Sequence, residues 1–513
     1  TVAKPAPRSG PPSLVRKTSW SALASLTSTA AGAASNVVIA RLLGPGGTGD
    51  IAYAMWVITT VGTVAGVGIP QVLARYLAEL DGGGQGNAMA GVARWVLRRG
   101  LVALGSGVAI VVALPLATNA VRSPGMLLAI VAAYVGQSTV TLYTAVLAGF
   151  QDYRRTARLN FTAAIVQLLG VSLGAAWAGS AGALVGYAAG ALVPATLCIR
   201  FAAGHAVRPS EAMSRRMRQF AFDSWIALTV SIVLWTRSEV FFLERTWGKA
   251  SVGMFTVGLT LGQLATQGPL LVGTALMPHF AQLVGAGDSA RLARTYSTLL
   301  KLMTFMTVPL CLGLAVASPV VVPIVFGSRF SAAAALASVL VAFAAVGAVA
   351  TVSSSATYAL ERARFIAFAG GIGAAVGALA YAVVIPRAGP LGAAVTRAVL
   401  HVAMVAWGMA YLARRAELRV PIAALFRICC VSIVAVLPIL AGVLSGRIAL
   451  VLVGVAIAAL LYITGIRVTR ALSAVDLAPL SRAIADVPWP GAKRAAGWLA
   501  YMHGDRVQHG CES

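Results

Sequence analysis

The chain has 513 residues, of which 59% are hydrophobic and only 11% are charged. A soluble domain carries about 25% charged residues, so this composition excludes a soluble globular protein. The net charge of +25 does not indicate nucleic-acid binding, because the basic residues form small clusters between apolar runs instead of one basic face or arm. The runs are about 20 residues long, which is the length of a helix that spans a bilayer.

In chain order, residues 1–17 are Pro-rich and basic and are typical of a disordered tail, and no signal-peptide cleavage site follows them. The apolar runs then predict an all-α polytopic membrane protein with about fourteen transmembrane helices. We expect these helices at 20–40, 51–69, 100–117, 125–148, 159–178, 181–199, 220–242, 252–282, 302–317, 331–358, 365–385, 391–411, 428–444 and 448–466. The expected organisation is a cytoplasmic tail at 1–18, a six-helix bundle at 19–203, a cytoplasmic linker at 204–219, a second six-helix bundle at 220–413, two further helices at 414–466 and a cytoplasmic tail at 467–513.

Orientation follows from the distribution of Lys and Arg over the short connections. Connections rich in basic residues, such as the one with Arg94, Arg98 and Arg99, alternate along the chain with poorer ones. Both ends of the chain join the richer set, as an even number of spans requires. We therefore expect both termini in the cytoplasm.

Two internal similarities predict a six-span repeat. A displacement of 210 positions brings Arg154, Gly179, Gly182, Ala183 and Val185 onto Arg364, Gly389, Gly392, Ala393 and Val395. A displacement of 204 brings Gly49 and Arg75-Tyr76 onto Gly253 and His279-Phe280. Because six is an even number, both copies keep the same orientation in the membrane, which is one of the repeat arrangements of secondary transporters.

The chain resembles a known family in two places. The stretches NVVIARLLGPGGTG at 36–49 and GIPQVLARYLAE at 68–79 are similar to the opening of polysaccharide (O-antigen type) flippases of the multidrug/oligosaccharidyl-lipid/polysaccharide exporter superfamily. WTRSEVFFL at 235–243 and VGMF at 252–255 look like the start of that family's second half. The resemblance implies two six-helix bundles that form a V open alternately to each side, and a lipid-linked glycan as the molecule that is moved.

Charged side chains within a bilayer are costly, by at least about 2.5–3.5 kcal/mol each, and usually face a cavity or a partner. The candidates at this depth are Arg237 and Glu239 in span 220–242, and Arg397 and His401 in span 391–411. Arg237, Arg397 and His401 would hold a pyrophosphate-linked headgroup, since guanidinium groups bind phosphate oxygens in pairs. Glu239 would hold one of the arginines, and structural ion pairing alone is the alternative. Asn36 and Gln137 would bind sugar hydroxyls or simply join helices.

Other classes of site have little support in the sequence. The five cysteines lack CxxC pairing, so neither a zinc site nor a disulfide framework is indicated. The Gly-rich stretch 41–49 lacks the Lys and Ser/Thr of a phosphate-binding loop and predicts a tight turn between two spans. No catalytic triad, metalloprotease motif or nucleotide loop is present. We expect no metal, no cofactor and no catalytic residue, and a transporter instead of an enzyme.

The acidic residues separate the transport hypotheses. The first six predicted spans contain no Asp or Glu at membrane depth, which favours an anionic substrate over the cationic drugs of a cation-coupled multidrug exporter. Together with the resemblance to the flippase family, this pattern predicts a flippase in a bacterial inner membrane that moves a polyprenyl-pyrophosphate-linked oligosaccharide from the inner to the outer leaflet by alternating access. A flippase for lipid II, the peptidoglycan precursor, is the first alternative, a multidrug exporter the second, and a non-transport scaffold for envelope assembly the third. The expected partners are this substrate, membrane lipid and polysaccharide-assembly proteins, with no nucleic acid, and we expect a monomer.

Overall fold

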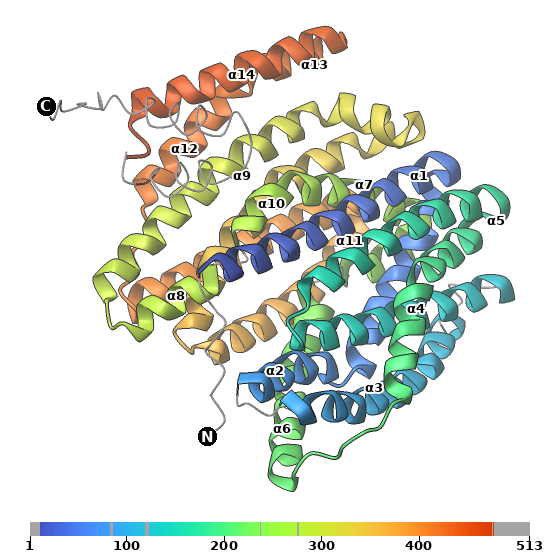
Figure 1. The fold of residues 1–513 in the computed structure, drawn as a ribbon. Coiled ribbons are helices and arrows are strands. Elements are labelled where there is room, and N and C mark those ends of the chain that lie inside the picture. The colour runs from blue at the N-terminus through green and yellow to red at the C-terminus, as the bar shows by residue number, and fades with distance from the viewer. Residues whose placement is uncertain are drawn as a thin grey trace, which may run out of the picture. The chain divides into compact units, whose positions relative to one another are not determined.

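The structure is a computed structural model that describes residues 11–82, 86–117, 123–235, 238–273, 276–473 and 476. In this part of the chain every regular element is a helix and there is no strand (Figure 1). The helices are α1 (Pro11–Ala65), α2 (Ile69–Gly82), α3 (Gly86–Ala117), α4 (Pro124–Gly149), α5 (Tyr153–Ala203), α6 (Glu211–Trp235), α7 (Ser238–Gly273), α8 (Leu276–Gly285), α9 (Ser289–Phe326), the 3₁₀ helix η1 (Ser328–Ala333), α10 (Ala334–Ala359), α11 (Ala363–Arg415), α12 (Ile422–Ala435), α13 (Leu437–Leu444) and α14 (Ile448–Thr469).

The apolar length of these helices confirms a multi-pass membrane protein. Within the described residues, eight helices are long and apolar enough to cross a bilayer. A ninth candidate is the pair Thr27–Ala65 and Ile69–Leu80, which is bent by 54°. Residues 11–18 of the expected N-terminal tail belong to α1, because proline is well tolerated in the first turn of a helix and α1 begins at Pro11. Residues 211–219 of the expected linker belong to α6.

Four long helices are each broken at one glycine, which explains why they contain more than one predicted span. The breaks lie at Gly44 in α1, Gly179 in α5, Gly248 in α7 and Gly389 in α11, where φ is 68°, 60°, 75° and 61°. Glycine adopts positive φ without the steric cost that a Cβ imposes. The breaks in α5 and α11 fall between the predicted spans 159–178 and 181–199, and between 365–385 and 391–411. The tight turn predicted at 41–49 is likewise confirmed at Gly44.

The contacts divide the chain into two compact units. The first, called unit 1 here, comprises Thr1–Val257, Val325–Phe330 and Gly370–Ala393, and the second, unit 2, comprises Gly258–Ile324, Ser331–Ala369 and Ala394–Ser513. The division passes through α7, α9 and α11, so these helices contribute to both units. The domain boundaries expected from the sequence stay a prediction.

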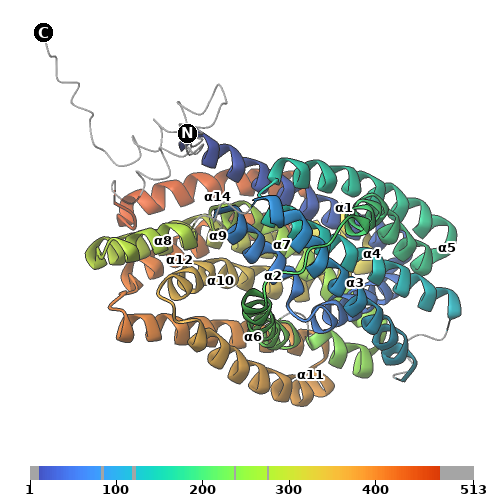
Figure 2. The same ribbon diagram turned by 60° about the horizontal axis from the view of Figure 1, so that its bottom comes forward.

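In unit 1, α4 lies beside α5, and the two arms of α5 on either side of Gly179 lie against each other (Figures 1 and 2). The arms meet at glycines: a Cβ on Gly174 would collide with the carbonyl group of Gly182, and a Cβ on Gly186 with the backbone of Gly170. Small residues that let two backbones approach closely are the usual means of joining membrane helices. The arms of α5 therefore form a tight helical hairpin.

In unit 2, the last helices are joined in a similar way. A Cβ on Gly442 of α13 would lie 2.7 Å from the carbonyl oxygen of Leu450 in α14, and one on Gly454 of α14 would lie 2.6 Å from that of Pro438 in α13. Tyr462 of α14 stacks on Phe305 of α9, with 5.5 Å between ring centroids, and donates a hydrogen bond of 2.8 Å to the Phe305 carbonyl. These contacts attach α13 and α14 to the rest of unit 2.

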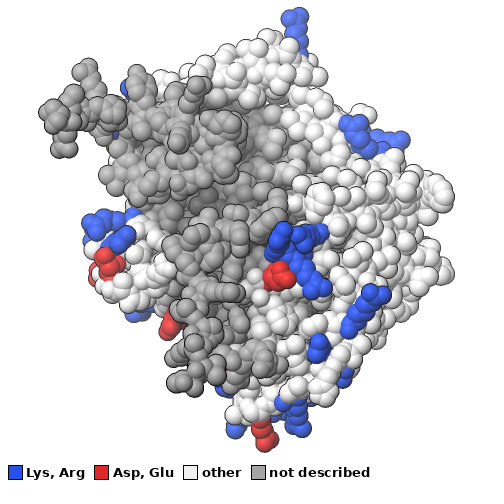
Figure 3. Space-filling view, in the orientation of Figure 1, with Lys and Arg blue, Asp and Glu red and all other residues white. Residues whose placement is uncertain are grey.

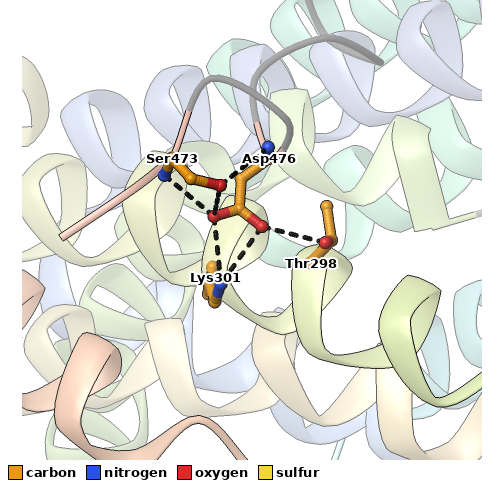
Figure 4. Close-up of polar contacts among 4 residues, drawn as sticks. All are labelled: Thr298, Lys301, Ser473 and Asp476. Carbon is orange, nitrogen blue, oxygen red and sulfur yellow. Dashed lines mark hydrogen bonds and ion pairs between the residues drawn. The ribbon is translucent and has the colours of Figure 1, made fainter. Parts of the chain in front are cut away.

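The segment after α14 is fixed to α9 by one carboxylate (Figure 4). Lys301 Nζ donates to both oxygens of Asp476, at 3.1 and 3.0 Å, and Thr298 Oγ1 donates to Asp476 Oδ1 at 2.9 Å. The backbone N–H and the hydroxyl of Ser473 donate to Oδ2 at 2.9 and 2.7 Å. The Asp476 side chain is only 5% exposed, so this ion pair is largely shielded from water.

The predicted repeat is confirmed at the turns that join α4 to α5 and α10 to α11. Gln151 in the first turn and Glu361 in the second are displaced by 210 positions and have φ values of 55° and 57°. The N–H of Asp152 donates to the carbonyl of Leu147 at 3.0 Å, and the N–H of Arg362 donates to that of Thr357, also at 3.0 Å. The helix breaks at Gly44 and Gly248 are displaced by 204, the second predicted offset.

Charge is sparse on the surface of the described residues. On the face shown in Figure 3, Lys and Arg side chains form a few separated groups within a wide surface that carries no charge. Large apolar side chains are strongly exposed, among them Trp177 at 92%, Leu444 at 79% and Val102 at 77%. Such a surface is suited to contact with lipid and would be unfavourable in water.

Candidate functional site

A cationic cavity lies in unit 2 between α7, α10 and α11. It has a volume of about 200 Å³, and its polar lining consists of Gln263 and Thr266 from α7 and Arg397 and His401 from α11. Arg397 and His401 are four residues apart, so they share one face of the second arm of α11. No Asp or Glu is among the described residues that line this cavity, so Arg397 gives it a positive charge.

A second cavity, which is polar but uncharged, lies in unit 1. It has a volume of about 320 Å³ and is lined in part by Thr59, Thr63, Gln71, Gln137 and Thr141, together with Ser138 and Tyr134. Its threonines donate to carbonyls of their own helices, as Thr59 does to Met55 at 2.7 Å and Thr141 to Gln137 at 2.9 Å. Their lone pairs remain available as acceptors. Gln71 Oε1 is buried and has no hydrogen-bond partner among the described residues, which makes it a further acceptor.

The two cavities correspond in part under the internal repeat, through the residues of α1 and α4 in unit 1 and of α7 and α10 in unit 2. A displacement of 204 relates Ile58, Thr59 and Gly62 of the unit 1 cavity to Gly262, Gln263 and Thr266 of the unit 2 cavity. A displacement of 210 relates Tyr134, Gln137 and Ser138 to Ala344, Gly347 and Ala348. The counterparts of Arg397 and His401 in unit 1 are Tyr187 and Ala191. Neither Tyr187 nor Ala191 is among the described residues that line the unit 1 cavity, so the wall that carries Arg397 belongs to the unit 2 cavity alone.

The structure distributes the residues predicted from the sequence among different places. Arg397 and His401 line the unit 2 cavity, and Gln137 lines the unit 1 cavity. Glu239 is only 1% exposed in α7, and Asn36 is half-buried in α1. Neither is among the residues that line these two cavities. Arg237 lies outside the described residues.

Several polar residues of the cavities were not predicted from the sequence. They are Thr59, Thr63, Gln71, Ser138 and Thr141 in unit 1, and Gln263 and Thr266 in unit 2. The spacing of four between Thr59 and Thr63 and between Gln137 and Thr141 places each pair on one helix face. This spacing within an apolar span is the signal that could have identified them.

The charged residues at the ends of the unit 1 helices form two groups. In one, Arg216 pairs with Glu79 at 3.1 Å, and Arg94 and Arg98 donate to carbonyls at the end of α5. In the other, Lys249 pairs with Asp50 at 2.6 Å, and Arg41 donates to the carbonyl of Val325 at 2.9 Å. The first group comes entirely from connections that we assigned to the cytoplasm, and the second from connections that we assigned to the outer side. Within unit 1, the contacts therefore match the predicted alternation.

Among the described residues, no group of three or more His, Cys, Asp or Glu side chains is arranged to hold a metal ion. The all-helical repeat, the broken helices and the two partly corresponding cavities define a multi-pass membrane protein of the transporter type. The chain belongs to the polysaccharide biosynthesis protein family, whose pattern matches residues 38–335, more than half of its length. Among curated proteins, none matches the chain by sequence.

Solved structures share this fold at low sequence identity. A lipid II flippase, MurJ, in an inward closed conformation is similar with a TM-score of 0.69 and 14% identity, over 87% of this chain and 98% of that chain. A multidrug resistance transporter of the MATE family, in the MOP superfamily, is similar with a TM-score of 0.63 and 13% identity, over 76% and 94%. A MOP superfamily transporter from Pyrococcus furiosus, described as having a binding pocket of reverse polarity, has a TM-score of 0.51 and 15% identity, over 78% and 95%. The fold is therefore that of MOP superfamily transporters, as the sequence resemblance predicted.

Proposed function

We propose that the protein is a flippase that moves a polyprenyl-pyrophosphate-linked oligosaccharide from the inner to the outer leaflet by alternating access. The observation that carries this proposal is the unit 2 cavity, whose described lining contains Arg397 and His401 but no Asp or Glu. A guanidinium group stays charged and binds phosphate oxygens in pairs. Such a cavity favours an anionic headgroup and disfavours a cationic drug. Arg237, whose position is not described, is proposed as a second phosphate ligand on the basis of the sequence alone.

The unit 1 cavity supports the glycan part of the proposal. Its hydroxyl and amide groups, without a formal charge among the described lining residues, are suited to sugar hydroxyls, which both donate and accept hydrogen bonds. Gln137 and Gln71 are the proposed amide ligands, because a Gln side chain offers a donor and an acceptor at once. Asn36 remains a candidate ligand and Glu239 a candidate partner for an arginine.

The family and the distribution of charge support the cellular setting. We propose a bacterial inner membrane with both termini in the cytoplasm, since the connections rich in Lys and Arg and both ends of the chain lie on one predicted side. The proposed partners are the lipid-linked substrate, membrane lipid and other proteins of polysaccharide assembly, and the proposed state is a monomer. An inside-negative membrane potential would favour outward movement of an anion by about 2.3 kcal/mol per charge per 100 mV.

Lipid II is the alternative substrate. The observation that favours it is the similarity in fold to a structure described as a lipid II flippase. Both substrates carry a pyrophosphate, so the unit 2 cavity fits either one. The two substrates differ in the attached glycan, so a flipping assay must compare them side by side.

The test is the rate at which purified protein in liposomes flips a fluorescent undecaprenyl-pyrophosphate oligosaccharide, compared with fluorescent lipid II. Arg397→Ala is expected to lower the initial rate about tenfold or more, which is the effect of losing a hydrogen bond to a charged group. The matched control is Arg387→Ala, because Arg387 lies on the same helix with an exposed side chain that donates to the carbonyl of Val383 at 2.8 Å. Arg237→Ala tests the second arginine.

Each outcome decides a separate point. The function is supported if the wild type flips the oligosaccharide. The site is supported if, in addition, the Arg397→Ala variant is folded but inactive and the Arg387→Ala variant is active. If all variants flip the oligosaccharide at the rate of the wild type, the proposed function is supported. Arg397 is then not part of the substrate site. Flipping of lipid II alone would make the alternative correct. Failure to flip either substrate would overturn the transport proposal for pyrophosphate lipids, and drug efflux would then be measured.

A further inference from the structure

A third cavity lies in unit 1 where α2, α3 and α6 come together. It has a volume of about 310 Å³ and is lined by the side chains of Arg99, Arg208 and Arg218, with Glu211 and Ser214 beside them. Three guanidinium groups against one carboxylate give the cavity a net positive charge. We infer that this cavity binds the phosphate group of an anionic membrane lipid, at a site separate from the two transport cavities.

Hydrogen bonds within unit 1 hold the walls of the cavity in place. Arg94 donates to the carbonyls of Phe201 and His205 at 3.1 and 3.0 Å, and Arg98 donates to those of Ala202 and Gly204 at 2.9 Å each. The N–H of Val207 donates to the carbonyl of Gly91 at 3.0 Å. These bonds fasten the connection 204–210, which carries Arg208, onto α3. The backbone at Arg208 is therefore held in place beside the cavity.

Arg99 and Arg218 reach the cavity from two helices. The guanidinium carbon of Arg99 lies 3.3 Å from the centroid of the Trp95 ring, and Trp95 also lines the cavity. Stacking on an indole leaves the edge of a guanidinium free to bind an anion. Arg218 follows Ser214 by four residues on α6, so both side chains lie on one helix face. The cations thus approach the cavity from different sides.

Ser214 is an independent sign of a ligand. Its residue is only 7% exposed, and its hydroxyl has no hydrogen-bond partner in the described part of the chain. A buried hydroxyl without a partner is unfavourable. A phosphate oxygen in the cavity would accept its hydrogen bond, as the neighbouring arginines would supply the charge. The burial of Ser214 at this place is therefore explained by an anion that occupies the cavity.

The position and the remaining walls favour a lipid as the source of that phosphate. Arg99 and Arg218 lie one and two residues before the predicted spans 100–117 and 220–242, which puts the cavity at the expected membrane boundary. Ile69, Val72 and Val96 form an apolar part of the lining, which suits the glycerol and upper acyl region of a phospholipid. Basic pockets between membrane helices on the cytoplasmic side commonly bind anionic headgroups.

The experiment is a titration of the purified full chain with phosphatidylglycerol, followed by native mass spectrometry. Arg218→Gln is expected to weaken binding about fivefold, the usual contribution of one basic residue near an anionic headgroup. Ser214→Ala, which changes no charge, is expected to weaken it about twofold or more. The matched control is Arg215→Gln on the same helix, since Arg215 is exposed and does not line the cavity. The Arg215→Gln variant should bind phosphatidylglycerol with the same affinity as the wild type.

The outcomes separate the lipid site from general attraction and from soluble anions. Equal weakening by Arg215→Gln and Arg218→Gln would overturn the proposal, because any surface charge would then act alike. Equal binding of phosphatidylcholine would overturn it too. Displacement of phosphatidylglycerol by millimolar inorganic phosphate would overturn the choice of a lipid as the source, and retention of the lipid would support it. Transport is not measured, so this site can fail while the proposed flippase function stands.

Discussion

Gly49 of α1 and Gly253 of α7 lie where the two helices touch, and each glycine contacts the backbone of the other helix. A Cβ on Gly49 would collide with the carbonyl oxygen of Lys249, and a Cβ on Gly253 would collide with that of Pro45. The displacement of 204 that relates Gly49 to Gly253 also relates Pro45 to Lys249. The contact is therefore reciprocal, with each copy of the repeat providing the same glycine and the same carbonyl.

Gly49→Ala is expected to destabilise the protein by about 1–3 kcal/mol, because an added methyl group in a closely packed contact forces the backbones apart. The measurement is the thermal unfolding temperature of the purified protein in detergent. Gly46→Ala is the control, since a Cβ there would meet no atom of the described residues within 4 Å. An unfolding temperature for Gly49→Ala equal to that of the wild type would show that the crossing is not closely packed.

Asp476→Asn is expected to lower the unfolding free energy by about 1–3 kcal/mol, because Lys301 loses the charged partner of its hydrogen bonds. The control is Asp288→Asn, whose side chain accepts from the N–H of Arg291 at 2.9 Å at the start of α9. Asn caps the start of a helix as well as Asp does, so the Asp288→Asn variant should unfold at the same temperature as the wild type. Equal unfolding temperatures for the wild type, Asp288→Asn and Asp476→Asn would contradict the prediction.

The stability contributed by Asp476 should depend on pH only under acidic conditions. Burial raises the pKa of Asp476, but the hydrogen bonds from Ser473, Lys301 and Thr298 outweigh it and hold this pKa below the ordinary value of 3.8. Because the unfolded chain takes up the proton more readily, the contribution is complete above 3.8 and is lost as the pH falls through the lower folded value. The difference in unfolding temperature between the wild type and Asp476→Asn should stay constant between about pH 8 and pH 5 and shrink below about pH 4. A difference that already disappears near neutral pH would mean that the carboxylate is not stabilised in the fold.

Arg94→Ala is expected to loosen the connection between α5 and α6. The Arg94 guanidinium donates to the carbonyls of Phe201, in the last turn of α5, and of His205, just after the helix. Carbonyls in the last turn of a helix lack the N–H partner four residues on that the helix interior supplies. Loss of such bonds costs about 1 kcal/mol and corresponds to roughly fivefold faster opening. The rate of opening is measured by hydrogen–deuterium exchange of peptides that cover 204–210. The control is Arg158→Ala, because Arg158 is an exposed residue of α5. Identical exchange in both variants would remove Arg94 from this role.

Much of the fold could be predicted from the sequence because the bilayer imposes one length on every span. The repeat was detectable from small residues, since a glycine such as Gly179 or Gly389 breaks a helix at the same place in both copies. Helix ends within an apolar run were not detectable. The predicted span 428–444 is divided between α12, which ends at Ala435, and α13, which begins at Leu437. The residues on both sides of this division are apolar, so hydropathy does not mark it.

The candidate site was predicted only in part, for a physical reason. Arg397 and His401 stand out because a charged or titratable side chain in an apolar span needs a cavity or a partner. Threonines such as Thr59 and Thr266 do not stand out, because each can satisfy its hydroxyl on its own helix, as Thr266 does with Gly262 at 3.0 Å. Whether they also face a cavity depends on tertiary packing, which a single sequence does not reveal.

The partial correspondence of the two cavities has a consequence for how the proposed ligand contacts can be altered. Arg397 and His401 occupy positions where the other copy of the repeat has Tyr187 and Ala191, so the two copies differ in charge at these positions. Under the proposed function, a substitution in the unit 2 cavity would change the affinity for an anionic group, and a substitution in the unit 1 cavity would change the affinity for a sugar. The two parts of one ligand could then be altered independently of each other.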